Sequence, residues 1–351
     1  MQDYLQGVVT EPFTLCRPDD LPGTTGELSS AAGLVRPGAR TVTGPGARRD
    51  LAGLLAALGE ARSALDRGPV TPVGEDPTES DLNKANDLGF GILRVRGEPV
   101  RVLTDAALRS IAAVLGLAAR NGTGFEPATW RRLVGGFDAL LLWLADPGRA
   151  PASHPVPAPG ERQPLEPGGA LRRWIYGHHV FMVFSQGCTL SLACLRERAA
   201  AGDGSGAAAA AATAVRLMWA SQGALSFAGD VAMEDYATEI RPTLMPPIAP
   251  PRMTGLHWRD HEALVRELAA ARDAWQWLAG SRPELLEEFR DAIDSAYSAH
   301  RGVCASFVGD RSPSLLATSR SSRPAVAVLE QFHRRRLDML PPSARDDGDG
   351  R

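Results

Sequence analysis

Two side chains able to bind a metal or react covalently stand four residues apart near the C-terminal end of the chain. They are His300 and Cys304, in the stretch "SAYSAHRGVCASF" over residues 295–307. On a helix, residues four apart lie on one face with Cβ atoms roughly 5–6 Å apart. The pair therefore predicts either a single metal ion or a macrocycle whose central metal takes the imidazole while its edge lies over the sulfur.

Other metal and hydrolytic motifs are incomplete. A di-iron helical bundle needs two Glu-x-x-His motifs, and the chain has one, Glu330 to His333 in "LEQFHRRRLD". The stretch "HEALV" lacks the second histidine of a zinc protease motif, and the sequence contains no CxxC pair, G-x-S-x-G or Gly-rich phosphate loop. Di-iron, zinc, serine-hydrolase and nucleotide chemistry are therefore disfavoured.

A haem fits the surroundings of His300 better. Haem needs an apolar slot between helices and one or two axial ligands, most often histidine. Phe289, Ile293 and Ala296 precede His300 at helical spacing, and apolar residues also follow it. Cys304 would lie over the porphyrin edge, where a vinyl group could accept its thiol as a thioether. Because the pattern differs from C-x-x-C-H, two core residues sharing a helix face by chance remain the alternative.

The motif "AHRGVC", late in a chain with helical patterning, resembles the H-x-x-x-C signature of a family of histidine-ligated haem-dependent aromatic oxygenases. The branch it resembles hydroxylates 3-methyl-L-tyrosine in saframycin-type antibiotic biosynthesis, and the family is related to tryptophan and indoleamine 2,3-dioxygenases. The resemblance implies a helical haem domain, an aromatic amino-acid substrate and hydrogen peroxide as oxidant. It also implies histidine on both faces of a haem held by one thioether, with His300 as proximal ligand and Cys304 as thioether donor.

The second axial ligand has several candidates. "GLHWRDHEALV" offers His257 and His261, and "YGHHVF" offers His178 and His179 inside a predicted helix. The resemblance favours His261, which follows the proline-rich "RPTLMPPIAPPRMTG", because one histidine must leave a six-coordinate haem before peroxide can bind. A released His261 would then be the catalytic base, with an unperturbed pKa of about 6.5. His178 and His179 remain the alternative, and one of them is instead expected to be a core histidine.

An amino-acid substrate needs a partner for its carboxylate, and the fork of arginine suits that geometry. "GDRSPSLLATSRSSRPAV" carries Arg311, Arg320 and Arg323, of which Arg320 and Arg323 are the predicted substrate-binding residues. "RRWIYGHHVF" offers Arg172 and Arg173 instead. For each of these arginines, ordinary surface charge is the competing interpretation.

The composition is that of a globular protein acting on small molecules. The 351 residues are 44% hydrophobic and 23% charged, with a formal net charge of −3. This balance argues against nucleic acid or an acidic membrane surface as partner. No signal peptide or run of about 20 apolar residues is found, so a cytoplasmic location is expected. Four cysteines do not make a disulfide framework, and a homodimer is left open.

The expected fold is all-α, with at most a small β-hairpin over 89–103. An irregular N-terminal arm is predicted over 1–48, a single helical haem domain over 49–340 and an acidic disordered tail over 341–351. Apolar periodicity and capping residues predict the helices. They span 50–67, 104–122, 126–145, 171–201, 207–228, 258–279, 283–308 and 324–337.

The predicted function follows from these residues together with the resemblance. It is the haem-dependent, peroxide-using hydroxylation of 3-methyl-L-tyrosine at the ring carbon ortho to the phenol, giving 3-hydroxy-5-methyl-L-tyrosine. Two alternatives stay open: a tryptophan oxygenase of the same superfamily, and a bis-histidine haem protein for electron transfer or sensing.

Overall fold

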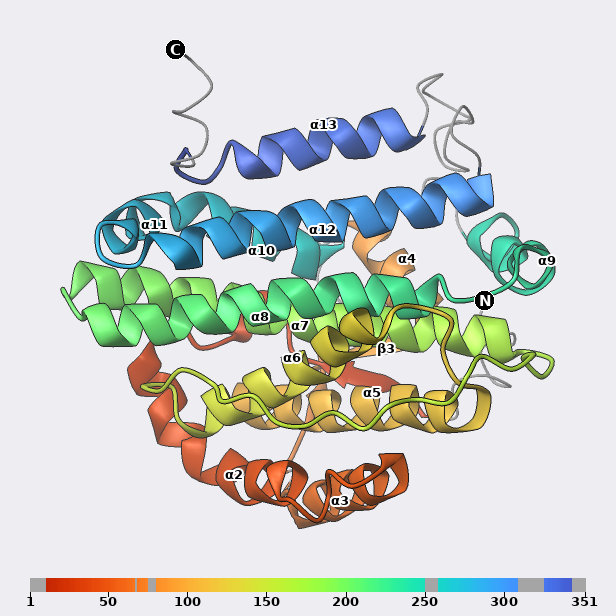
Figure 1. Cartoon of the computed structure of the whole chain (residues 1–351), viewed down its shortest axis with the longest axis horizontal. Coiled ribbons are helices and arrows are strands. Elements are labelled where there is room, and N and C mark those ends of the chain that lie inside the picture. Colours follow the sequence, from red (N-terminus) through yellow and green to blue (C-terminus); the bar gives the residue numbers. More distant parts are fainter. Residues whose placement is uncertain (1–10, 67, 75–79, 250–257, 309–324, 343–351) are drawn as a thin grey trace.

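The computed structural model describes residues 11–66, 68–74, 80–249, 258–308 and 325–342, and it stacks helices in layers (Figure 1). The helices α2 and α3 form one outer layer, α13 forms the opposite one, and α7 and α8 lie between them. The longer helices are α2 (Thr25–Thr43), α3 (Leu51–Ala64), α4 (Asp81–Gly89), α5 (Pro99–Asn121), α6 (Pro127–Ala145), α7 (Gly169–Ala200), α8 (Gly204–Ala228), α10 (Arg259–Ala270), α11 (Arg272–Ala279), α12 (Pro283–Val308) and α13 (Ala325–Leu337). The prediction of a mostly α-helical fold is confirmed.

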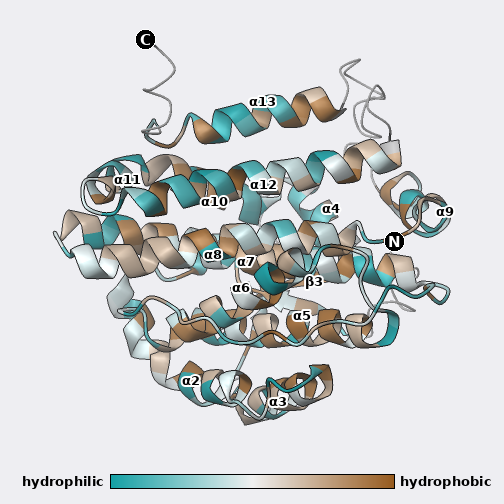
Figure 2. Cartoon of the chain, in the orientation of Figure 1, coloured by the Kyte–Doolittle hydropathy of each residue, from teal (hydrophilic) through white to brown (hydrophobic). Residues whose placement is uncertain are grey.

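The central pair α7 and α8 is packed closely because small residues line the contact. A Cβ atom added to Gly177 would lie 2.6 Å from the Cβ of Ala228, and one added to Gly187 would lie 3.0 Å from Leu217 Cδ1. Most of α7 is buried around its whole circumference, as expected for a helix covered on all sides. Figure 2 shows many hydrophobic residues on these central helices, whereas α13 also carries many hydrophilic ones.

Short strands and helical turns connect these layers. Strand β3 (Ile92–Arg96) pairs in parallel with β1 (Phe13–Leu15) and antiparallel with β2 (Thr71–Pro72). The predicted hairpin over 89–103 was therefore wrong. The Gly-Glu-Pro sequence starts α5 instead of forming a turn, because the Glu98 carboxylate accepts hydrogen bonds from the N–H groups of Val100 and Arg101. After α8, the chain forms a short α9 (Met233–Asp235) and a π-helical turn, η2 (Tyr236–Ile240).

The predicted irregular arm over 1–48 is wrong for residues 25–43, which form α2. Thr24 and Glu27 make a reciprocal capping box at its start, and Leu28, Val35 and Val42 are buried on its inner face. Pro37 lies inside the helix and does not end it. The domain division at residues 49 and 340 stays a prediction, and most of the predicted acidic tail lies outside the described residues.

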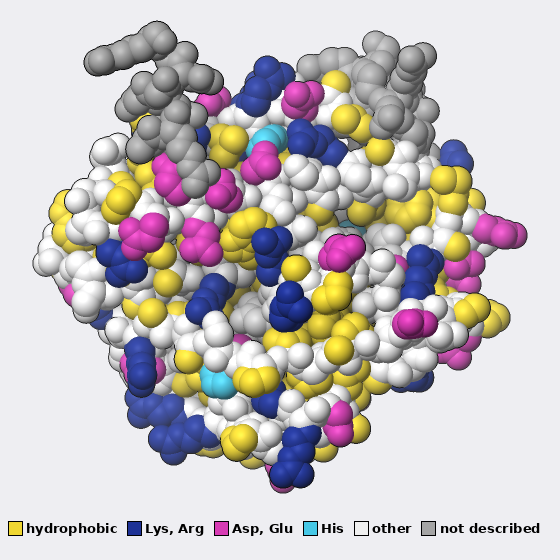
Figure 3. Space-filling view, viewed as in Figure 1, with side chains coloured by type: hydrophobic (Ala, Val, Ile, Leu, Met, Phe, Trp, Pro, Cys, Tyr) yellow, Lys and Arg dark blue, Asp and Glu magenta, His cyan; other side chains and the backbone are white. Residues whose placement is uncertain are grey.

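Helix α5 is the one helix in the described ranges with the length and composition to cross a membrane, but 72% of its apolar stretch is buried inside the fold. A core helix of a globular protein has this property. The face drawn in Figure 3 carries acidic and basic side chains interspersed, without a continuous field of one sign.

Candidate functional site

His300 stands in the buried stripe of α12. Phe289, Ile293 and Ala296 are buried at successive helical positions before it. Val303 continues the stripe against α8, where a Cβ atom added to Gly229 would lie 2.6 Å from Val303 Cγ2. Because α12 is helical through residues 300–304, His300 and Cys304 do share one face, as their spacing predicts.

Neither the His300 ring nor the Cys304 thiol has a hydrogen-bond partner in the part of the chain that the structure describes. Both side chains are half-buried. Burial lowers the pKa of His300 below its usual value of 6.5 and raises the pKa of the Cys304 thiol above 9.0. Buried polar groups are normally paired. An unpaired neutral imidazole beside a protonated thiol is therefore free to meet a group that binds between them.

Aromatic side chains from segments far apart in the chain gather beside α12. The ring centroids of Phe90 and Trp174 each lie 4.5 Å from that of His178. Trp258 lies 4.8 Å from Phe90. We call Phe90, Trp174, His178 and Trp258 the aromatic cluster. It combines the C-terminal side of α4, the interior of α7 and the start of α10.

A stacked pair extends this apolar region to the C-terminal end of α12. The Tyr236 and Phe307 rings lie 4.1 Å apart and are inclined by 6°. Tyr236 also packs edge-on to Trp174 at 6.2 Å. Burial, and then the nearby Cys304 thiol, raise the pKa of the Tyr236 phenol. The π-helical turn η2 thus places a tyrosine next to the predicted thioether donor.

His178 is neutral and has a fixed tautomer. Its Nδ1–H donates to the Trp174 carbonyl at 2.7 Å, so the lone pair is on Nε2. Burial lowers the pKa of His178 to about 4, and the neighbouring His300 adds to this lowering. The structure therefore brings His178 of α7 and His300 of α12 into the same electrostatic neighbourhood.

His179 is the core histidine of the pair. Its Nε2–H donates to the Phe90 carbonyl at 2.7 Å, and its ring stacks on Phe13 at 4.1 Å. Burial lowers the pKa of His179 to about 3. With both its ring and its Nε2 engaged, His179 is removed from the candidate axial ligands, and His178 is left as the alternative to His261.

Of the remaining predicted site residues, the structure describes His261 only. His261 lies in the first turn of α10, is half-buried and follows Trp258 of the aromatic cluster by three positions. Its role as the second ligand stays a prediction. His257, Arg311, Arg320 and Arg323 lie outside the described residues, so their roles also stay predictions.

Arg172 and Arg173 are ion-paired within the fold. Arg173 is fully buried, where its guanidinium donates to Asp230 and to the Gly122 carbonyl. Arg172 pairs with Glu166 at 2.9 Å at the surface. The contacts of Arg173 are therefore all within the fold, whereas a role for Arg172 in binding the substrate carboxylate stays a prediction.

No group of three or more His, Cys, Asp or Glu side chains is arranged to hold a metal ion among the described residues. His333, from the single Glu-x-x-His motif, lies 3.1 Å from Asp294 through Nε2 and stacks on Tyr297. These contacts fasten α13 to α12.

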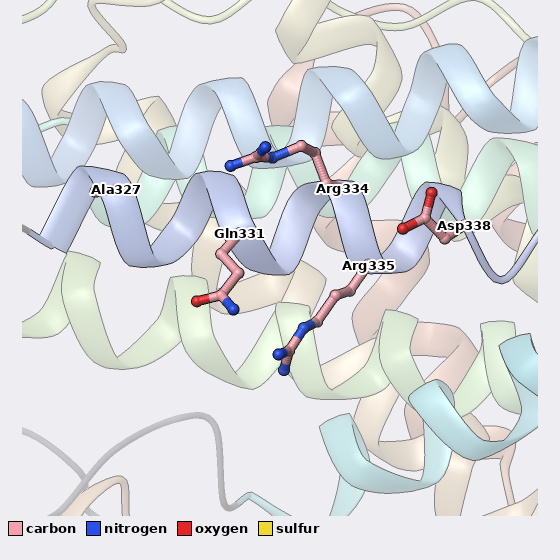
Figure 4. Close-up of a pocket in the computed structure, with 5 residues that line it drawn as sticks. All are labelled: Ala327, Gln331, Arg334, Arg335 and Asp338. Atoms are coloured by element: carbon pink, nitrogen blue, oxygen red, sulfur yellow. The ribbon is translucent and has the colours of Figure 1, made fainter.

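Two surface hollows of the described chain are lined by residues outside the aromatic cluster. One hollow of about 490 Å³ lies on the exposed side of α13, between Ala327 and Asp338 (Figure 4). A second, of about 330 Å³, lies between α2, α6 and the loop after α6.

Sequence reasoning missed Phe90, Tyr236 and Trp258. Trp258 had a signal, because it stands between the two histidines of "LHWRDH". Phe90 and Tyr236 had none, since each lies more than 60 positions from His300 and reaches the region only through the packing of α4 and η2.

Comparisons with known proteins agree with one another. The family model described as SfmD 3-methyl-L-tyrosine peroxygenase matches residues 14–288. A curated relative from Streptomyces lavendulae, named 3-methyl-L-tyrosine peroxygenase, is 53% identical over 341 residues, covering 97% of this chain and 93% of the relative. A crystal structure of reduced SfmD, soaked with sodium hydrosulfite, superposes with a TM-score of 0.78 at 53% identity, covering 86% of this chain and all of that one. The chain belongs to the 3-methyl-L-tyrosine peroxygenase family.

Proposed function

We propose that this protein is a haem-dependent peroxygenase that hydroxylates 3-methyl-L-tyrosine ortho to the phenol, giving 3-hydroxy-5-methyl-L-tyrosine. The substrate and the use of peroxide follow from the name of the 53% identical relative. The observation that carries the haem assignment is the pair His300 and Cys304 on one face of α12, which has no hydrogen-bond partner among the described residues and lies near His178 of the aromatic cluster.

The side chains present fit a haem. His300 offers a neutral imidazole, the form that binds a metal, and the aromatic cluster with Tyr236 and Phe307 offers flat apolar walls. The buried indole N–H of Trp174 has no acceptor within the described chain, which suits a polar group on a bound ligand. Description of the relative's structure as reduced is also in keeping with a redox-active centre.

Cys304 would form the single thioether. Its raised pKa keeps the thiol protonated, and addition of S–H across a vinyl C=C forms one C–S and one C–H bond. This addition consumes no oxidant or reductant, so it needs no partner cysteine. His300 and His261 would be the two residues that hold the iron. When bound, the haem supplies the oxidising chemistry from peroxide.

The chain's own residues would orient the substrate and move its protons. The aromatic cluster excludes water and gives the substrate ring an apolar surface. His178 stays neutral and can accept a hydrogen bond at Nε2, because its Nδ1–H is already engaged. His261, once it leaves the iron, would be the base toward the phenol or peroxide. Arg320 or Arg323 would hold the carboxylate.

One experiment tests the assignment at two levels. The purified wild-type protein should convert 3-methyl-L-tyrosine and hydrogen peroxide into a product heavier by one oxygen atom, and L-tryptophan should be a poor substrate. Acid–acetone should leave the haem on the wild-type polypeptide and remove it from Cys304→Ala. Haem extracted from intact wild-type protein would disprove the thioether.

The variant His300→Ala tests the proximal ligand. We expect it to lose most of its haem or its low-spin absorption spectrum, and normal loading with a normal spectrum would assign the ligand to another residue. An electron-transfer or sensor protein would show no peroxide-dependent turnover. The proposed partners are the amino acid and peroxide, in the cytoplasm, with a homodimer left open.

A further inference from the structure

A buried network of charged side chains surrounds the residue before His261. Arg94 of β3 forms a two-pronged pair with Asp87 of α4, with both N–O distances at 2.8 Å. The same guanidinium donates to both carboxylate oxygens of Asp260, in the first turn of α10. It also donates to the Cys16 carbonyl at 3.0 Å. All five N–H donors of Arg94 are used.

Two further side chains complete this Arg94 network. Gln186 of α7 donates to Asp260 at 2.7 Å and to the Cys16 carbonyl at 2.9 Å. The indole N–H of Trp258 donates to Asp87 at 3.0 Å. Arg94 thereby ties β3, α4 and the residue after β1 to the start of α10, and Gln186 adds α7 to the network.

Stability does not explain this arrangement. Burial alone would lower the pKa of Arg94, but Asp260 and Asp87 outweigh it and raise the pKa, so the charge persists. Buried ion networks pay a desolvation penalty, and apolar replacements are often neutral or stabilising. The network instead orients α10, because it fixes where the first turn of this helix begins and how that turn is rotated about the helix axis.

We infer that the Arg94 network is the positioning device for His261: it pins residues 258 and 260, so the next side chain in the turn has one orientation. This inference rests on the proposed role of His261 as an axial ligand. Successive residues of a helix are rotated by about 100° about its axis. A small rotation of the turn at Asp260 would therefore also turn the His261 side chain away from its binding direction. The network would hold the helix start fixed and leave the His261 side chain as the part of this turn that can rotate.

The variant Asp260→Asn tests the inference on the haem-loaded protein. It removes one charge and keeps the size, so the covalent haem at Cys304 should remain by mass. We expect the low-spin fraction of the ferric spectrum to fall and cyanide to bind at least tenfold faster, because a misdirected imidazole competes less well for iron.

The matched control is Asp138→Asn. Asp138 pairs with Arg48 in a buried ion pair whose side chains are 2% and 3% exposed, on α6 and the loop after α2. A general loss of stability would affect both variants, whereas a positioning role predicts that cyanide binding in Asp138→Asn stays within twofold of the wild type. Equal spectra and rates in Asp260→Asn and wild type would overturn the inference.

Two additional variants keep the test decisive. Gln186→Met removes the hydrogen bond to Asp260 and leaves the ion pairs, so it should shift spectrum and cyanide rate in the same direction even if Asp260→Asn does not fold. An unchanged Gln186→Met would then count against the inference. In His261→Ala, a persistent bis-histidine spectrum would overturn the ligand assignment and the inference together, whereas an open site there with unchanged network variants would overturn the inference alone.

Discussion

His178 and His179 are chain neighbours with different surroundings. Successive residues of a helix point about 100° apart, so His179 faces Phe13 and the Phe90 carbonyl while His178 enters the aromatic cluster. The sequence predicts that one of the two belongs to the core but cannot say which, because the deciding partners lie about 90 and 165 positions away. The structure makes that distinction.

At this scale we predict how His179 affects stability in acid. Its pKa is about 3 in the folded protein and about 6.5 when unfolded. Below pH 6.5, His179 binds a proton in the unfolded chain but stays unprotonated in the folded protein. The free energy of unfolding that is present above this pH is therefore lost as the pH falls. The free energy of unfolding should drop by about 1.4 kcal/mol per pH unit from this group between pH 5.5 and 4.

The variant His179→Gln isolates this contribution. Its side-chain amide can still donate to the Phe90 carbonyl but does not titrate. Urea unfolding at several pH values should therefore give a shallower pH dependence than the wild type. Parallel curves for the two proteins would contradict the assigned pKa.

Among the helices, periodicity predicted the ends of α12 correctly and those of α3 to within a few residues. It failed for α2, where frequent Gly, Pro and Thr hid the capping box at Thr24. It also predicted one helix over 258–279 where the structure has two, α10 and α11, which meet at Ala271. Helix ends depend on local hydrogen bonds that composition averages away.

Two adjacent glycines of α6 have different surroundings, so their replacement by alanine should have opposite effects on stability. A Cβ atom on Gly136 would lie 2.1 Å from the Cβ of Ala220 on α8, whereas one on Gly135 would meet nothing within 4 Å. Gly136→Ala should destabilise the protein by about 1–3 kcal/mol through overpacking. Gly135→Ala should stabilise it by up to about 1 kcal/mol, because alanine favours the helix. Thermal unfolding of the two variants measures the difference, and equal shifts would show that α6 and α8 are not in close contact.

At the scale of the whole molecule, the candidate site was predictable only where its residues share one segment. His300 and Cys304 could be paired from their spacing on α12. The aromatic cluster could not, because it is assembled from α4, α7 and α10. The Arg94 network was equally hidden, since Arg94 and Asp260 are 166 positions apart and meet only once β3 and α10 are in place.

The four cysteine thiols of the chain are expected to differ in their reactivity. Cys16, Cys188 and Cys194 are at most 1% exposed, and burial raises the pKa of each thiol to about 12. Cys304 is the half-buried one of the four. In a haem-free protein such as His300→Ala, N-ethylmaleimide should therefore modify one thiol under native conditions and four after denaturation.

In the haem-loaded wild type, the thioether would occupy Cys304. Intact mass should then show no maleimide adduct on the native protein and three on the denatured protein. Cys304→Ser is the matched control, because it lacks the same thiol without a thioether and should also give three adducts when denatured, but with no haem on the polypeptide. Four adducts on denatured, haem-loaded wild type would exclude the covalent link, because every thiol of the chain would then be free.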